Sequence, residues 1–184
     1  MKIKQFIRLL ICFFTVSTLC QAQEPKALNS VYFEGGGNGL FYSFNYDRAF
    51  NLSNKIKLAP RAGVSFLPDI DKHDHLKNFI IPIELNLLYG NNKLSKNFAE
   101  LGIGVTFFEF VKGYKTINNI DQAVIGMSNV GLLRVGFRHQ KPSGGIMYRA
   151  GLLVPISQDG YSKQRVGDDI FFRIWAGFSI GYSF

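Results

Sequence analysis

Two histidines and two aspartates lie within five residues of this chain, in the segment Asp71-Lys72-His73-Asp74-His75. In an extended chain, a His-x-His pair points both rings to one side, as a divalent cation needs. No fixed third ligand accompanies the pair, so a closed tetrahedral set is not formed. We interpret the segment as a solvated polar loop and predict neither a metal site nor any other cofactor site.

A serine close to a histidine is the second kind of chemistry that this chain offers. Ser65 and Ser157 are expected near the same end of the molecule as His73 and His75, but no spacing requires them to meet. The sequence contains no Gly-x-Ser-x-Gly elbow, no His-Glu-x-x-His helix and no phosphate-binding loop. We expect no enzyme, and a lipid-modifying activity is the minor alternative.

Charged residues recur at alternate positions of several strand-like segments, and they share one parity. The set comprises Glu34, Arg61, Glu84, Glu100, Arg134, Arg149 and Arg173. Alternate residues of a β-strand lie on the same face. We therefore expect these side chains to pair across a narrow interior, because an unpaired buried charge would cost roughly several kcal/mol.

The residues of the opposite parity are apolar. Eight segments carry the alternation: 30–37, 40–50, 56–67, 78–90, 98–111, 129–139, 146–156 and 169–184. The last one places Phe178, Ile180, Tyr182 and Phe184 on one face, and it is long for an ordinary globular sheet. An apolar exterior around a charged interior favours a membrane-spanning barrel over a soluble lipocalin-like barrel. The predicted fold is all-β, an eight-stranded antiparallel up-and-down transmembrane β-barrel.

The connections between these segments alternate in length. Short turns are expected at 51–55, 91–97 and 140–145, and longer polar loops at 68–77, 112–128 and 157–168. Outer-membrane barrels have short periplasmic turns and long external loops. The Gly37-Asn38-Gly39 turn is the exception, since it is tight but lies on the long-loop side.

Two residues fit the pattern poorly. Pro82 cannot donate to a strand ladder, so it is expected to mark a bulge. Trp175 has inward parity, and we expect it to pack against glycines of neighbouring strands rather than to serve as a platform for a ligand.

Residues 1–22 have the features of a cleaved secretory signal, namely a basic start, the apolar run Leu9 to Leu19 and a small-residue exit. The alternatives are a retained anchor helix and a lipoprotein acylated at Cys20. Cleavage before Gln23 would leave 23–184 as one barrel domain and lower the formal net charge from +8 to +5, because Lys2, Lys4 and Arg8 are removed. The remaining positive charge is spread along the chain, so we predict no nucleic-acid partner.

Several runs of the mature chain carry a family resemblance. They are 29–34, 42–48, 61–65, 81–86, 100–105, 136–138, 148–151 and 181–184. Together they resemble small outer-membrane β-barrel proteins of Bacteroidetes-type bacteria, and more distantly the chain is similar to OmpA- and OmpX-type barrels. The resemblance implies a location in the outer membrane, and it implies that the terminal Phe184 is recognised by the outer-membrane assembly machinery.

Taken together, these features predict an outer-membrane barrel with a lumen closed by ion pairs. Its partners would be membrane lipid, the assembly machinery and an unknown surface ligand held by the external loops. The alternatives are a narrow channel and a lipid-modifying enzyme. An eight-stranded barrel encloses little more than its own side chains, so a closed lumen is favoured over a conduit.

Overall fold

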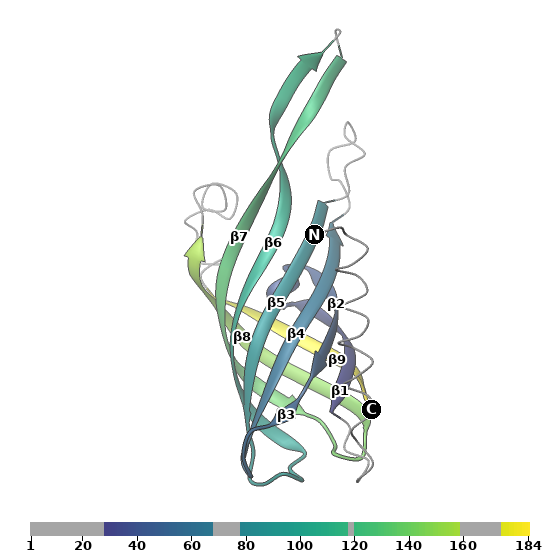
Figure 1. Cartoon of the computed structure of the whole chain (residues 1–184), viewed down its shortest axis with the longest axis vertical. Helices are drawn as coiled ribbons and strands as arrows, with labels where there is room; N and C mark the ends of the chain where they lie inside the picture. Colours follow the sequence, from purple (N-terminus) through teal and green to yellow (C-terminus); the bar gives the residue numbers. More distant parts are fainter. Residues whose placement is uncertain (1–27, 68–77, 118–119, 159–173) are drawn as a thin grey trace, which may run out of the picture.

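The computed structural model describes residues 28–67, 78–117, 120–158 and 174–184, and these residues form an elongated barrel (Figure 1). Its elements follow one another in chain order. They are β1 (Asn29–Gly36), η1 (Gly37–Gly39), β2 (Tyr42–Arg48), β3 (Phe50–Asn51), β4 (Ile56–Leu67), β5 (Asn78–Tyr89), β6 (Asn97–Ile117), β7 (Ile120–His139), β8 (Gly145–Gln158) and β9 (Trp175–Ser183). Among these residues, the single helical element is η1, one turn of 3-10 helix, and none of them form a helix long and apolar enough to cross a membrane.

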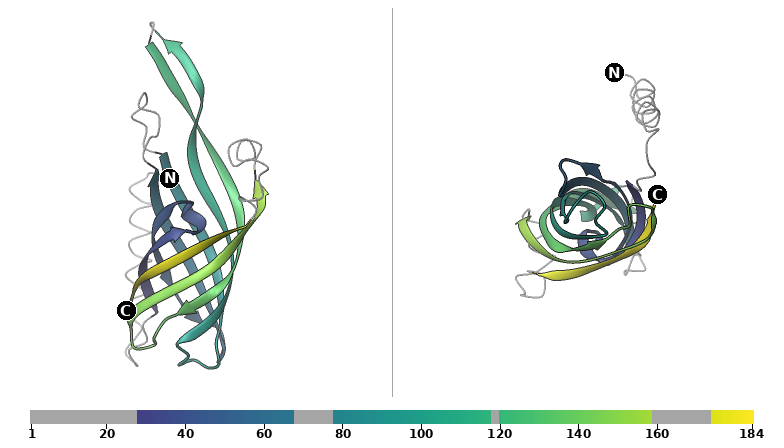
Figure 2. Two further views of the ribbon diagram at one scale, coloured as in Figure 1. Left: turned by 180° about the vertical axis from the view of Figure 1, so that it is seen from behind. Right: turned by 90° about the horizontal axis from the view of Figure 1, so that it is seen from below.

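The strands form one closed antiparallel sheet. Their order is β2-β1-β9-β8-β7-β6-β5-β4-β3, and β2 also pairs with β4, which completes the ring seen from below in Figure 2. β2 and β3 both pair with β4 and are separated only by Ala49, so they occupy one strand position of the wall. The predicted eight-stranded up-and-down β-barrel is confirmed.

The first and last strands, β1 and β9, pair along their length and close the wall, and residues 29 and 184 lie together at one end. Asn29 and Phe184 exchange two backbone hydrogen bonds, of 3.0 and 2.9 Å. The short turns after β3, β5 and β7 lie at the same end, which is the lower end in Figure 1. An even number of strand positions brings residues 28 and 184, the two ends of the described barrel, to that same end.

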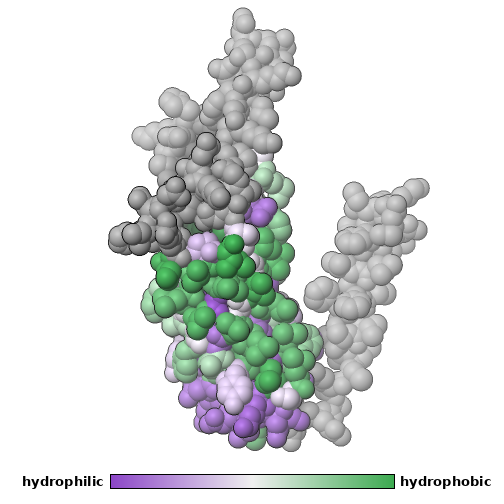
Figure 3. Space-filling model, turned by 90° about the vertical axis from the view of Figure 1, so that its left-hand side faces the viewer, coloured by the Kyte–Doolittle hydropathy of each residue, from purple (hydrophilic) through white to green (hydrophobic). Residues whose placement is uncertain are grey.

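Side chains alternate between the two faces of the wall over most of its length. Leu101, Val135 and Ile146 point outward and are 57%, 62% and 65% exposed, whereas Glu84 and Arg134 point inward and are buried. The outward residues form an apolar band with a hydrophilic lower rim (Figure 3). A water-soluble barrel would carry its apolar side chains inside, so the lipocalin-like alternative is not supported.

One predicted loop is in fact a pair of strands. The segment 112–128 was expected to be a polar loop, but β6 continues to Ile117 and β7 begins at Ile120. The hairpin extends well beyond the rest of the wall (Figure 1), with a register shift between Val111 and Gly113. Lysine and glutamine gave the segment its loop-like composition. Both residue types are compatible with a two-stranded ribbon outside the barrel, where neither face needs to be apolar.

Pro82 does not produce the expected bulge. The register between β4 and β5 is the same on both sides of it, with Ala62 opposite Ile83 and Ser65 opposite Ile80. The two residue pairs between these positions are absent from the β4–β5 ladder, whereas Pro82 still pairs with Thr106 of β6. The wall therefore tolerates the missing donor by losing local pairs to β4, not by inserting a residue.

Candidate functional site: the ion-paired lumen

Glu84, on β5, is the centre of a buried hydrogen-bond network inside the barrel. Its Oε2 accepts hydrogen bonds from Arg61 Nη1 at 2.7 Å and from Asn38 Nδ2 at 2.8 Å. Its Oε1 accepts from Arg134 Nε at 2.7 Å and from Arg149 Nη2 at 3.1 Å. One carboxylate thus joins η1, β4, β7 and β8, four elements that are distant in the sequence.

Glu34, on β1, is the second bridging carboxylate. It forms an ion pair with Arg61 and accepts a hydrogen bond from Arg134 Nη2 at 2.8 Å. Ser179 Oγ adds a bond of 3.3 Å from β9. Arg61 is further held by Asn45 Oδ1, which lies 3.1 Å from its Nε and 2.8 Å from its Nη2. Glu34 and Glu84 therefore share Arg61 and Arg134, and the four side chains form a closed charged ring.

Another layer of paired side chains lies between this charged ring and the short turns. Arg149 Nε donates to Glu100 Oε2 at 2.7 Å, and its Nη1 donates to the Tyr32 hydroxyl at 3.0 Å. The Tyr32 ring also lies beneath the guanidinium groups of Arg61 and Arg149, at 5.5 and 5.8 Å from ring centroid to Cζ. Such cation–π contacts stabilise arginine where water is excluded.

The lowest charged layer is a separate pair. Arg138 donates from Nη1 and Nη2 to the two oxygens of Asp47, at 2.7 and 2.8 Å, and its Nη2 also donates to Ser30 Oγ at 3.1 Å. A two-pronged arginine–carboxylate contact fixes both distance and orientation. Within the described residues, four buried arginines therefore meet four buried carboxylates, and the charges of the network balance.

The structure brings six of the seven sequence-predicted lumen residues into this network. They are Glu34, Arg61, Glu84, Glu100, Arg134 and Arg149. Arg173 lies outside the described residues. Asp47 and Arg138 have the same parity in the sequence as these six residues, but the predicted set does not contain them. The sequence feature that could have indicated this pair is the inward parity of both residues, at strand positions close to the short turns.

The β1–β2 turn folds into the barrel, above the charged layers. η1 contacts β1, β2, β4, β5, β6, β8 and β9, and its three residues are buried. Asn38 donates to Glu84, and its carbonyl oxygen accepts from Thr106 Oγ1 at 2.7 Å. The sequence predicted a tight turn here but not that it would lie inside the lumen.

Glycines make room for this internal turn. Gly37 has φ +72°, and a Cβ there would overlap the Glu34 carboxylate. On β9, a Cβ on Gly177 would lie 2.8 Å from the Gly37 Cα, and on β6, a Cβ on Gly104 would lie 2.9 Å from Asn38 Nδ2. The run of glycines from Gly35 to Gly37 was the sequence signal for a backbone that must be packed closely.

Trp175 holds the turn from the side. Its Nε1 donates to the Gly37 carbonyl oxygen at 3.0 Å, and its ring packs against Val130, Leu132 and Leu153. Trp175 was expected to pack against glycines of neighbouring strands, but its described contacts are with these apolar side chains and with the carbonyl oxygen of Gly37 in η1. The lumen thus has an apolar layer on its long-loop side.

A second apolar layer closes the end near the short turns. Ala49, Ala59, Leu88 and Phe98 form a buried cluster, and the Lys57 Nζ lies 4.7 Å from the Phe98 ring centroid. The charged network is therefore enclosed between two apolar layers. In a buried interior of this kind, the pairing of each charge is energetically important.

The other candidate residues do not assemble into a site within the described part of the chain. His73 and His75 lie outside it, and no group of three or more His, Cys, Asp or Glu side chains there is arranged to hold a metal. Ser65 is buried inside the barrel and Ser157 is exposed at the end of β8. Phe184 is exposed at the lower end, next to Asn29, and its role in assembly stays a prediction.

Comparison with known proteins supports the fold. No protein-family model matches the chain, and no curated protein matches it in sequence. The crystal structure of the N-terminal β-barrel domain of OprF from Pseudomonas aeruginosa is similar to it, with a TM-score of 0.50 and 12% sequence identity. The match covers 85% of this chain and 95% of that domain. At such low identity the similarity concerns the fold, which is an OmpA-like eight-stranded barrel.

Proposed function

We propose that the protein is an integral outer-membrane barrel with a closed lumen, and that it acts as a structural or surface-binding protein through the loops opposite the short turns. The observation that carries the proposal is the lumen itself. Its charges are buried and balanced, η1 fills the space above them, and an apolar layer lies at each end. A conduit would need water where these side chains lie.

The membrane location is supported by two features. The outward side chains are apolar around the wall, and the fold matches an outer-membrane barrel domain. We further propose that residues 1–22 direct secretion and are removed, and that Phe184 is recognised by the assembly machinery. Sequence motifs support an origin in the Bacteroidetes-type group that they resemble.

Conductance in planar lipid bilayers tests the closed lumen. Reconstituted wild-type protein should show no stable single-channel steps. A variant that lacks residues 37–39, the whole of η1, should give measurable conductance if its folded fraction is intact. The Gly35→Ala variant is the matched control, because a Cβ there would make only an ordinary contact, 4.0 Å from the Phe33 ring. Regular steps from the wild type would refute the closed lumen and favour the narrow channel.

Surface binding and enzymatic activity need separate tests. Surface cross-linking and pull-down from intact cells should capture a partner through the external loops. Lipid A mass spectra of a deletion strain should match those of the parent strain, and a change restored by the wild-type protein alone would favour the lipid-modifying enzyme. Loss of outer-membrane integrity without a captured partner would favour the structural role.

A further inference from the structure

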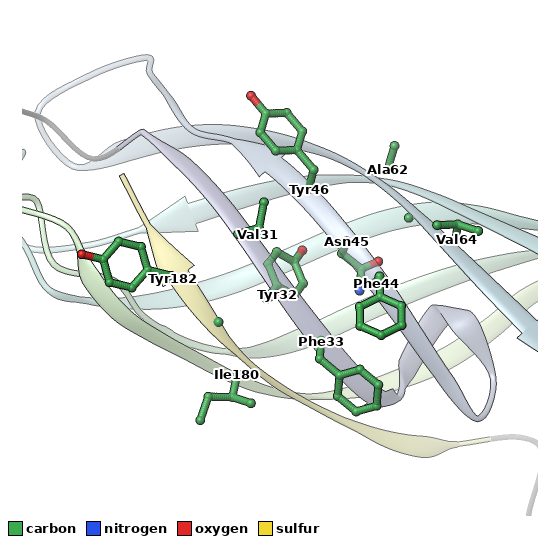
Figure 4. Close-up of a pocket in the computed structure, with 12 residues that line it drawn as sticks. Val31, Tyr32, Phe33, Phe44, Asn45, Tyr46, Ala62, Val64, Ile180 and Tyr182 are labelled. Carbon is green, nitrogen blue, oxygen red and sulfur yellow. The ribbon is translucent and has the colours of Figure 1, made fainter.

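A shallow apolar groove of about 660 Å³ lies on the outer surface of the wall, over β1, its neighbours β9 and β2, and β4 on the far side of β2 (Figure 4). Val31 lies at its centre, paired with Tyr46 on one side and with Tyr182 on the other. Phe33 and Phe44 bound it toward the long-loop end, with ring centroids 5.4 Å apart. A small side chain between large aromatic ones creates the depression.

The groove leads toward a cation at its lower end. Arg48 follows Tyr46 by two residues on β2, so it lies on the same outer face, about 7 Å closer to the short turns. Arg48 pairs with Asn29 in the strand register, and the Tyr46 hydroxyl donates to Asn29 Oδ1 at 2.9 Å. Polar groups therefore begin where the apolar groove ends.

Arg48 differs from the other arginines that the structure describes. Four of these form ion pairs inside the barrel. Arg48 forms no ion pair with any acidic side chain within 28–67, 78–117, 120–158 and 174–184, and its guanidinium lies 5.6 Å from the Phe50 ring centroid. An arginine at an apolar–polar boundary is suited to a phosphate, because its planar group donates two parallel hydrogen bonds.

We propose that this surface binds one glycerophospholipid molecule, with an acyl chain in the groove over Val31 and the headgroup phosphate against Arg48. The inference rests on the proposed outer-membrane location, in which the short turns face the periplasm. The groove then lies in the inner leaflet, and its occupant is a glycerophospholipid rather than lipid A. The Tyr46 hydroxyl reaches Asn29 at the boundary between the two parts, where tyrosine is favoured in membranes.

Native mass spectrometry of the folded protein in mild detergent, titrated with palmitoyl-oleoyl phosphatidylglycerol, tests the site. The wild type should retain one lipid. Arg48→Gln should weaken retention about tenfold, as expected for the loss of a charged hydrogen-bonding partner. Val31→Trp fills the groove and should remove the specific lipid while keeping the outer face apolar.

Two matched variants serve as controls. Lys93→Gln removes a cation from another short turn, and Val135→Trp adds the same bulk on β7, three strands away around the wall. Both should retain the lipid as the wild type does. Equal retention by Arg48→Gln and Lys93→Gln would overturn the site. So would retention of the lipid by Val31→Trp equal to that of the wild type, because it would mean that the groove plays no part.

Membrane insertion separates this inference from the proposed function. Folded wild-type protein is assayed in parallel for heat-modifiable migration and for recovery in the outer-membrane fraction. Absence from that fraction would refute the proposed function. Normal insertion, with lipid retention insensitive to both Arg48→Gln and Val31→Trp, would refute the phospholipid site alone.

Discussion

Replacing Glu84 by alanine should destabilise the barrel more than replacing Glu100 does, because Glu84 has more partners in the network. The carboxylate accepts hydrogen bonds from Asn38, Arg61, Arg134 and Arg149. Removing one partner of a buried ion pair costs about 3–5 kcal/mol. Four separate charged hydrogen bonds would add to about 6–12 kcal/mol, but this sum overestimates the loss.

The smaller figure applies because each arginine keeps another partner. Arg61 and Arg134 retain Glu34, and Arg149 retains Glu100. We therefore expect a loss of about 3–5 kcal/mol for Glu84→Ala. Glu100→Ala affects only Arg149, which keeps Glu84 and the Tyr32 hydroxyl, so its cost should be about 1.5–3 kcal/mol.

Urea unfolding in phospholipid vesicles measures these differences. The chain has a single tryptophan, Trp175, which contacts η1, so its fluorescence reports on the lumen directly. Leu101→Ala is the control, since this outward side chain lies in the apolar band and contributes nothing to the network. A loss below about 1 kcal/mol for Glu84→Ala, or a larger loss for Glu100→Ala, would show that the network does not stabilise the barrel as argued.

Three further predictions concern the turn, assembly and sidedness. Gly37→Ala should lower the temperature of the heat-modifiable transition clearly more than Gly35→Ala, because only the first introduces a Cβ into the Glu34 carboxylate; equal shifts would contradict the internal packing of the turn. Deletion of Phe184 should leave unassembled chain in the periplasm, and unchanged assembly kinetics in cells would count against a terminal signal. Protease added to intact cells should spare 91–97 and 140–145, and cleavage there in sealed cells would invert the topology.

Much of the fold follows from local alternation of side chains, and this is why it could be predicted. Arg134 and Val135 are neighbours in sequence, yet one is buried and the other is 62% exposed. A membrane barrel needs apolar residues outside and polar residues inside along nearly its whole wall, so each strand carries this alternation independently. The alternation does not show where a strand ends. The β6–β7 hairpin continues beyond the point at which apolar and polar residues stop alternating.

The pairing of charges depends on how the strands are staggered, and no local pattern contains that information. Glu34 and Arg134 are 100 residues apart and meet only because β1 and β7 bring them to the same height in the lumen. Parity placed both residues inside but could not assign them to each other. For the same reason, Asp47 and Arg138 had the correct parity without being identified as a pair.

The internal position of the β1–β2 turn depends on tertiary contacts that outweigh local preference. Leu40 follows η1 with φ +65°, a conformation that is unfavourable for a residue with a side chain and costs about 1 kcal/mol or more. A turn exposed to solvent would have no compensation for this strain. Here Asn38 is bound to Glu84, and the Gly37 carbonyl oxygen accepts from Trp175. The charged network thus holds η1 inside the barrel, and η1 covers the network. Because the two parts stabilise each other, opening the lumen would require both to be disrupted, which argues for binding at the exterior and the loops rather than for passage through the barrel.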